Sequence, residues 1–197
     1  MGGAWESVLF IETPPGIHCY VFFTYGYHIA DFLRHVRIPI DDRDNDWREM
    51  FLHHIAAVAL YPGFIFSNIM GLGVVLAWLH DIADITVCIC RISNILDLRL
   101  LTPITWFVML ITWGYTRIFI LPLYIYATAT EVKFPAPVEH FTIAIQLELC
   151  FLSIMQVLHI FWFYLFLLMG WRLVMKGEQK ELINTIESEV DETKKAQ

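Results

Sequence analysis

Charged residues are scarce in this chain of 197 residues: they make up 17% of it, against 57% hydrophobic residues. A water-soluble domain of this length needs more charge to cover its surface. The formal net charge is −7, so the chain also lacks the basic surface of a nucleic-acid-binding protein. The composition therefore excludes a nucleic-acid partner and predicts an integral membrane protein with one compact helical domain.

Cysteine is also sparse, and its spacing is not that of metal ligands. Cys19, Cys88, Cys90 and Cys150 lie within or beside apolar runs. We expect them to be small buried hydrophobic residues. The first residues carry no basic region, so no cleavable signal peptide is evident.

What the chain has in abundance is long apolar runs, five of which could cross the ~30 Å hydrocarbon core of a membrane as helices. They are about Leu9–Phe32, Trp47–Ile65, Ile69–Leu96, Pro103–Tyr126 and Phe141–Met175. The first is the weakest because Pro14 and Pro15 interrupt it. The last is longer than a membrane requires, so it should tilt or emerge as a helix. We predict an all-α membrane protein with about five transmembrane helices.

Lysine and arginine residues predict the orientation in the membrane. If five spans are counted, all of them fall on one side except Lys133, which lies opposite, and Arg117, which lies inside a span. The positive-inside rule assigns that side to the cytosol. We therefore expect a lumenal N-terminus with the first span over residues 1–30, a membrane domain over 31–177 and an acidic cytosolic tail over 178–197. Lys194 and Lys195 in that tail fit the dilysine pattern for retrieval to the endoplasmic reticulum.

Ionisable side chains inside the predicted spans are the strongest functional signal. A charge buried in hydrocarbon is costly, so such groups usually face a cavity or one another. His80, Asp81 and Asp84 share one stripe of the third span, because residues three or four apart adjoin on a helix. The second span carries two consecutive histidines, His53 and His54, which point about 100° apart.

The turn between these two spans predicts how the groups meet. Ser67–Asn68 is the best turn signal, and it lies midway between positions 54 and 80. A hairpin there would bring His54 and His80 to similar depth. Histidine is an acid–base group near neutral pH, a carboxylate fixes its tautomer, and an imidazole can act as a nucleophile. From the residue types, catalysis, a metal site and structural polar packing all remain open.

The stretch FLHHIAAVALYPGFIFSNIMGLGVVLAWLHDIAD resembles the signature of the TLC-domain family and, within it, of the ceramide synthases, which are sphingoid-base N-acyltransferases. That signature combines a His-His pair, an Asn (here Asn68), a Gly (here Gly73) and Leu-His-Asp-x-x-Asp. The similarity continues through YTRIFILPLYIYAT and QVLHIFWFYLFLLMGWRLVMKG. It covers roughly residues 31–177.

This resemblance implies an endoplasmic-reticulum enzyme that joins a fatty acyl-CoA to the amine of a long-chain base. It also implies a cavity in a barrel of six membrane helices, lined by His53, His54, His80, Asp81 and Asp84. Acyl-CoA would be a co-substrate, and we expect no metal and no tightly bound cofactor. The expected partners are lipid substrates and membrane lipids, with a homo-oligomer or partner subunits completing the barrel.

Some features depart from the family pattern. Gly71 stands where a basic residue is frequent, and Ala57 and Pro62 stand where hydroxyl residues follow the His-His pair. We expect these changes to alter head-group recognition rather than acid–base chemistry. Five spans would leave a six-helix barrel one helix short. A catalytically inactive structural or lipid-binding subunit of a larger assembly is therefore the alternative. A metal site like that of lipid hydroxylases is a weaker one, because only one adjacent histidine pair exists.

Further residues are candidates for the substrate cavity. Asn68 belongs to the signature. Arg117 could snorkel or pair with a neighbouring helix, or it could balance an acid such as Glu148 or a phosphate of coenzyme A. His159 and Trp162 belong to the last matching block and could line the cavity. A packing histidine and an interfacial aromatic are the alternatives for these two.

Overall fold

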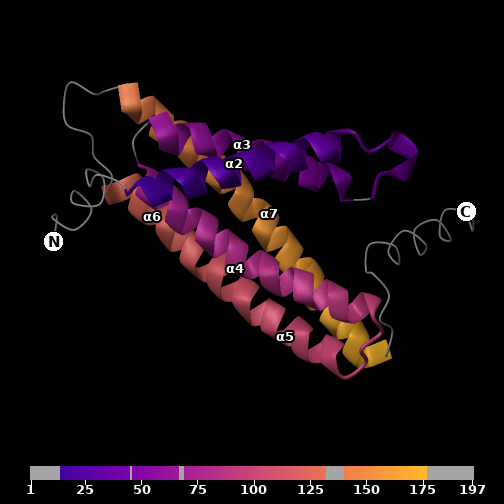
Figure 1. Cartoon of the computed structure of the whole chain (residues 1–197). Coiled ribbons are helices and arrows are strands. Elements are labelled where there is room, and N and C mark those ends of the chain that lie inside the picture. The colour runs from indigo at the N-terminus through magenta and orange to yellow at the C-terminus, as the bar shows by residue number, and fades with distance from the viewer. Residues whose placement is uncertain (1–13, 45, 67–68, 132–139, 177–197) are drawn as a thin grey trace, which may run out of the picture.

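The computed structural model describes residues 14–44, 46–66, 69–131 and 140–176 of the chain. Within these ranges it is helical and contains no strand. The elements are α2 (Pro15–Val36), η1 (Ile40–Asp42), α3 (Trp47–Phe66), α4 (Met70–Ile95), α5 (Leu101–Trp113), the π-helical η2 (Gly114–Ile120), α6 (Leu121–Glu131) and α7 (His140–Lys176) (Figure 1). The elements α5, η2 and α6 form one continuous rod. The predicted all-α class is confirmed.

Four of the rods are long and apolar enough to cross a membrane: Trp47–Phe66, Met70–Ile95, Leu101–Thr130 and Ile143–Trp171. They correspond to the second to fifth predicted spans, and α7, with 37 residues, is longer than a membrane requires, as predicted. The first predicted span corresponds to α2, which has 22 residues but is not among the four. It ends at Val36 rather than Phe32. The predicted start at Leu9 lies outside the described residues.

Proline residues mark where these helices begin and where they change. Pro15 is the first residue of α2, a position where the missing backbone N–H has no helical partner to lose. The predicted interruption of the first span is therefore a helix start. Pro122 lies directly after the π-helical η2. A proline ring crowds the carbonyl four residues before it, and the wider π turn occupies that stretch.

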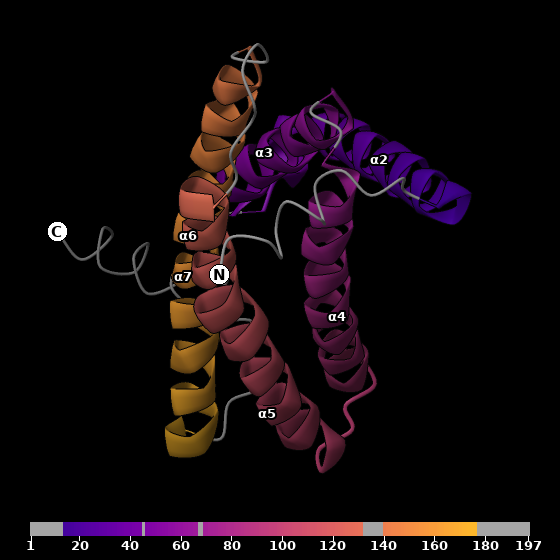
Figure 2. The same ribbon diagram turned by 90° about the vertical axis from the view of Figure 1, so that its left-hand side faces the viewer.

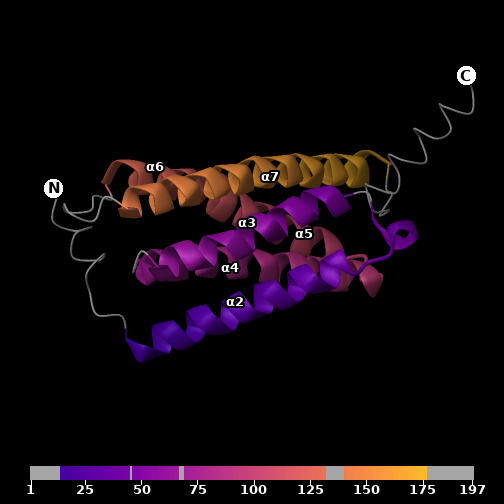
Figure 3. The ribbon, with the colours of Figure 1, turned by 90° about the horizontal axis from the view of Figure 1, so that it is seen from above.

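The rods pack side by side in a closed order. α2 packs against α3, α3 against α7, α7 against the α5–η2–α6 rod, that rod against α4, and α4 against α2 (Figures 2 and 3). α3 also approaches α4 at Gly73, where a Cβ atom would lie 2.7 Å from Cδ2 of Phe64. This contact gives Gly73 of the sequence signature a packing reason. The order of contacts agrees with the predicted barrel-like arrangement.

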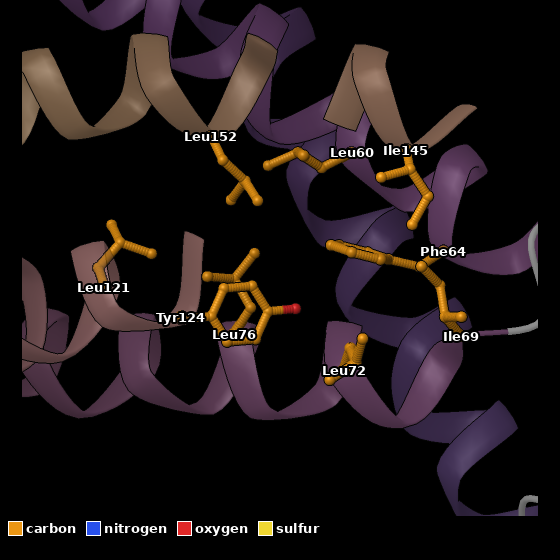
Figure 4. Packing of buried hydrophobic residues seen from close by; sticks show 9 residues of the cluster. All are labelled: Leu60, Phe64, Ile69, Leu72, Leu76, Leu121, Tyr124, Ile145 and Leu152. Atoms are coloured by element: carbon orange, nitrogen blue, oxygen red, sulfur yellow. The ribbon is translucent and has the colours of Figure 1, made fainter. Parts of the chain in front are cut away.

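Two apolar clusters occupy different levels along the rods. The first consists of Leu60, Phe64, Ile69, Leu72, Leu76, Leu121, Tyr124, Ile145 and Leu152 (Figure 4). The second consists of Ala83, Trp113, Leu158 and Trp162. Along α4, for example, Leu76 belongs to the first cluster and Ala83 to the second. The part of α4 between these two residues carries polar side chains.

The cysteines are free thiols, but the expectation that they are buried is wrong for most of them. Cys90 is buried, whereas Cys19, Cys88 and Cys150 are exposed on the helices. Exposed side chains on the outside of apolar rods face lipid in a membrane, and a small, weakly polar thiol is compatible with that environment.

Candidate active site

A layer of polar side chains lies between the two apolar clusters. We define this polar layer as His53 of α3, His80 and Asp84 of α4, Arg117 of η2 and His159 of α7. The layer draws on four rods. His80 lies between Leu76 of the first cluster and Ala83 of the second, and Arg117 lies between Trp113 of the second cluster and Leu121 of the first. His159 is flanked by Leu158 and Trp162 of the second cluster. Residues far apart in the sequence are thereby brought to one level inside the ring of helices.

Arg117 connects the layer. Its side chain is 1% exposed. Nη1 donates to Nε2 of His159 at 3.0 Å, and Nη2 donates to Oδ1 of Asp84 at 2.8 Å and to the backbone carbonyl of His80 at 3.0 Å. The guanidinium also lies 5.0 Å from the ring centroid of Trp113. A buried guanidinium is tolerated only with such partners, so the snorkelling alternative does not describe this arginine.

The two central histidines face each other. Nε2 of His80 lies 3.2 Å from Nε2 of His159, and Nδ1 of His80 lies 2.8 Å from the carbonyl of Leu76. A carbonyl only accepts, so Nδ1 of His80 carries hydrogen; a guanidinium only donates, so Nε2 of His159 accepts from Arg117. With both rings neutral, Nε2 of His80 keeps a free lone pair, while the lone pair on Nε2 of His159 accepts from Arg117; a proton taken up by His80 would share that acceptor with Arg117. The pair can therefore hold one additional proton between the two nitrogens.

His53 joins this pair from α3. Its ring packs edge-on against His159 and Trp162, with centroids 6.1 and 5.4 Å away. Nδ1 of His53 is buried and has no hydrogen-bond partner. On the opposite side of the histidine pair, Nε1 of Trp113 donates to the carbonyl of His159 at 3.2 Å. The structure therefore brings together His53, His80, His159 and Trp162; the cavity that they would line stays a prediction.

His54 points away from the layer and toward α2. It is 5% exposed, and its Nε2 lies 3.7 Å from Oδ2 of Asp31. Its ring also contacts that of His35, at 5.0 Å between centroids. The predicted approach of His54 to His80 does not occur between these described residues. Consecutive helical residues diverge by about 100°, and it is His53 that takes the inward position.

The two aspartates do not contact the ring of His80 in the described structure. Asp81 accepts a hydrogen bond from the hydroxyl of Tyr20 on α2 at 2.7 Å. Asp84, whose side chain is 61% exposed, accepts from Arg117. The carbonyl of Leu76 sets the tautomer of His80 instead. The acid is thus coupled to the histidines through Arg117, a connection that helical spacing within one span cannot indicate.

Glu148 lies apart from Arg117. It is 2% exposed, and among the described residues neither carboxylate oxygen has a hydrogen-bond partner. The carboxyl lies over Gly63 of α3, where a Cβ atom would collide with it. The alternative in which Arg117 balances an acid is therefore realised by Asp84 and not by Glu148. Asn68, the remaining cavity candidate, lies outside the described residues.

Sequence reasoning missed the contribution of α2 and the role of Trp113. Tyr20, Asp31 and His35 all face α3 or α4. A signal did exist: Asp31 and Arg34 have the spacing of an ion pair on one helix face. Trp113 precedes Arg117 by one helical turn. Within the described helices no group of three His, Cys, Asp or Glu side chains is arranged to hold a metal ion, so the metal-site alternative finds no ligand set there.

The comparison with known proteins agrees with this arrangement. The chain matches the TLC domain over residues 4–168, which include the whole polar layer. It belongs to the TLC-domain family. This TLC domain is 30% identical to mouse ceramide synthase 4 over 160 residues, which are 80% of the chain and 39% of the relative.

Two further relatives are more distant. Human ceramide synthase 4 is 24% identical over 194 residues, covering 98% of the chain and 48% of the relative. Ceramide synthase hyl-2 of Caenorhabditis elegans is 22% identical over 199 residues, covering 95% and 58%. The chain therefore spans between two fifths and three fifths of the length of these relatives. No solved structure matches this TLC domain significantly.

Proposed function

We propose that this TLC domain transfers a fatty acyl group from acyl-CoA to the amine of a long-chain base inside the membrane. Similarity to proteins named ceramide synthases supports the reaction class. The observation that carries the proposal is the facing pair of Nε2 atoms in His80 and His159, 3.2 Å apart beside Arg117. The chemistry requires such a group, because an amine must lose a proton before it can attack a thioester.

The histidine pair would supply that step. A long-chain amine is protonated at neutral pH, and its proton passes to the space between the two Nε2 atoms. The amine nitrogen then forms the amide bond to the acyl carbon while the carbon–sulfur bond to coenzyme A breaks. As the amide forms, its nitrogen gives up a second proton, which passes to the departing thiolate, and the proton held by the histidine pair is released from the site. An acyl-imidazole on the His53–His54 pair would split the same transfer into two steps.

Arg117 is placed to assist at the thioester. Its Nη1 and Nη2 atoms are occupied, but Nε is buried without a partner. A thioester oxygen that gains negative charge as the amine attacks would accept a hydrogen bond from this N–H. Fixed donors of this kind stabilise a transition state more than a ground state. We assign Arg117 this role in addition to coupling Asp84 to His159.

The proposed reaction also indicates the cellular membrane and the partners of the protein. The protein is integral to the membrane, and we place it in the endoplasmic reticulum with its C-terminus in the cytosol, where acyl-CoA is available. Acyl-CoA is then a co-substrate, and the reaction needs no tightly bound cofactor. Long-chain base and acyl-CoA are the lipid partners, and a homo-oligomer or partner subunits remain a prediction.

The test is amide formation by the purified full chain in lipid nanodiscs. Given a sphingoid base and acyl-CoA of several chain lengths, it should release one coenzyme A per amide formed. His80→Ala should reduce the rate by about 10²–10⁴-fold, the usual effect of losing an acid–base group. Asp84→Asn should be milder, since Asp84 acts through Arg117. A well-folded protein that makes no amide at any chain length would instead support the structural or lipid-binding subunit.

A further inference from the structure

The two adjacent histidines of α3 have different partners. His53 packs into the polar layer against His159, whereas His54 faces Asp31 of α2. We propose that Asp31 is the positioning residue of His54, orienting its ring and balancing the charge that the ring gains when it binds a proton. This inference rests on the proposed acyl transfer. It means that α2 contributes a positioning residue to the site.

Asp31 is itself fixed in place. Its Oδ1 accepts two hydrogen bonds from Arg34, at 2.6 Å from Nη2 and 3.0 Å from Nε. The second oxygen, Oδ2, is thereby left for His54, whose Nε2 lies 3.7 Å away. This distance exceeds a hydrogen bond but falls within that of an ion pair. Catalytic contacts are often long in the absence of substrate and shorten when a proton is taken up.

The ring of His54 also contacts a second residue of α2. His35 lies against it with centroids 5.0 Å apart. His35 is locked in turn by stacking on Trp47 at 5.1 Å and by the 3.0 Å contact between its Nε2 and the Trp47 carbonyl. His54 therefore lies against two neighbouring residues on one face of α2, a ring held by Trp47 and a carboxylate paired with Arg34. Contacts of this kind restrict the orientation of an imidazole.

The free nitrogen of His54 shows what this orientation achieves. Nε2 faces Asp31, so Nδ1 is the nitrogen left for chemistry, and it is buried with no hydrogen-bond partner in the part of the chain that the structure describes. The other charged or titratable groups around the ring are the basic His28, Arg34, His35 and His53. Asp31 is thus the carboxylate that acts on His54 among the described residues. Asp81, the acid that the sequence motif suggests, is taken by Tyr20.

The experiment compares Asp31→Asn, which keeps the shape and removes the charge, with Asp41→Asn in the exposed loop after α2. The full chain is labelled with ¹⁵N-histidine in nanodiscs, and the ring signals of His54 are assigned by their loss in His54→Gln. Asp31→Asn should shift these signals and leave those of His80 unchanged. It should also lower kcat at least ~10-fold with little change in KM or Tm, less than the loss of a whole acid–base group. Asp31→Glu should restore part of the rate.

The possible outcomes separate the two proposals. Unchanged His54 signals in Asp31→Asn would overturn the assignment whatever the activity. Shifted signals with an unchanged kcat would overturn its role in the reaction. An unmodified protein that makes no amide would contradict the proposed function, while the signals would still decide whether Asp31 orients His54. An equal loss of rate in Asp41→Asn would attribute the effect to surface charge and also count against Asp31.

Discussion

Arg117 shows how a single residue makes the polar layer possible. A guanidinium that is 1% exposed has lost its hydrogen bonds to water. It donates instead to Asp84, His159 and the carbonyl of His80. Lysine would carry the same charge, but as a single ammonium it cannot hold these three partners in a fixed fork. The arrangement of the layer therefore depends on arginine at this position.

Removing Arg117 should destabilise the whole protein. Arg117→Gln leaves Asp84 and His159 without their donor. Asp84 is 61% exposed, so the ion pair is buried only at the arginine, and we expect a loss of about 1–3 kcal/mol, the usual cost of a buried polar group that loses its partner. Thermal unfolding of the purified protein in nanodiscs measures this cost. Arg99→Gln is the matched control, because Arg99 and its partner Asp97 are both exposed and 3.6 Å apart, and exposed pairs contribute little. Equal Tm values for the two variants would contradict the account of Arg117.

Glu148 presents the opposite case, a buried acid to which no described residue donates a hydrogen bond. Both of its carboxylate oxygens lack hydrogen bonds and the side chain is 2% exposed. Burying such a group costs free energy. Glu148→Leu should therefore raise the Tm, measured in the same unfolding assay, whereas a fall in Tm would show that the carboxyl has a stabilising partner in the membrane.

At the scale of elements, close approach between helices depends on particular glycines. A Cβ atom at Gly73 would lie within 3.1 Å of three carbons of Phe64, whereas one at Gly71 would meet nothing within 4 Å. The same substitution two residues apart on α4 thus tests the α3–α4 contact. Gly71→Ala should be neutral or stabilise by up to about 1 kcal/mol through helix propensity.

Gly73→Ala should destabilise the protein by about 1–3 kcal/mol, the usual cost of forcing an extra methyl group into a packed contact. It should also reduce the rate of amide formation, because α4 carries His80. Tm and activity are measured for both alanine variants. Two alanine variants with the same Tm would show that α3 and α4 do not touch at Gly73.

The positions of the helices could be predicted from sequence, because the thickness of the hydrocarbon core sets the length of an apolar run and polar residues mark its ends. The partners of the polar side chains could not. The stripe of His80, Asp81 and Asp84 was visible, but each residue bonds to a different element: His159 of α7, Tyr20 of α2 and Arg117 of η2. Spacing along one helix fixes which residues share a face, and only the packing of five rods decides what meets that face.

The first predicted span illustrates the same limit. Its prolines suggested an interruption, yet Pro15 begins α2. Once α2 packs along α3 and α4, its Tyr20, Asp31 and His35 find partners, which hydropathy alone cannot show. The polar side chains that lower the hydropathy of α2 are the same ones that contact the site.

For the whole molecule, the distribution of lysine and arginine predicts a cytosolic C-terminus and a lumenal N-terminus. If α2 crosses the bilayer with the other rods, its start and the loop after it lie on opposite sides. In a cysteine-free background, Asp41→Cys should react with a membrane-impermeant maleimide from the cytosol, and Gly16→Cys should react from the lumen only. Both cysteines reacting from one side would place α2 on the membrane surface and reverse the assignment of the N-terminus.

The central claim is that the His80–His159 pair, held by Arg117, takes the proton from the amine. The most direct measurement is the rate of amide formation by His159→Gln, beside His18→Ala in the first turn of α2. The glutamine oxygen can still accept from Arg117 but cannot bind a proton at neutral pH, so the fold should remain and the rate should fall about 10²–10⁴-fold. His18→Ala should keep the rate of the unmodified protein. A His159→Gln variant with the full rate would contradict the account.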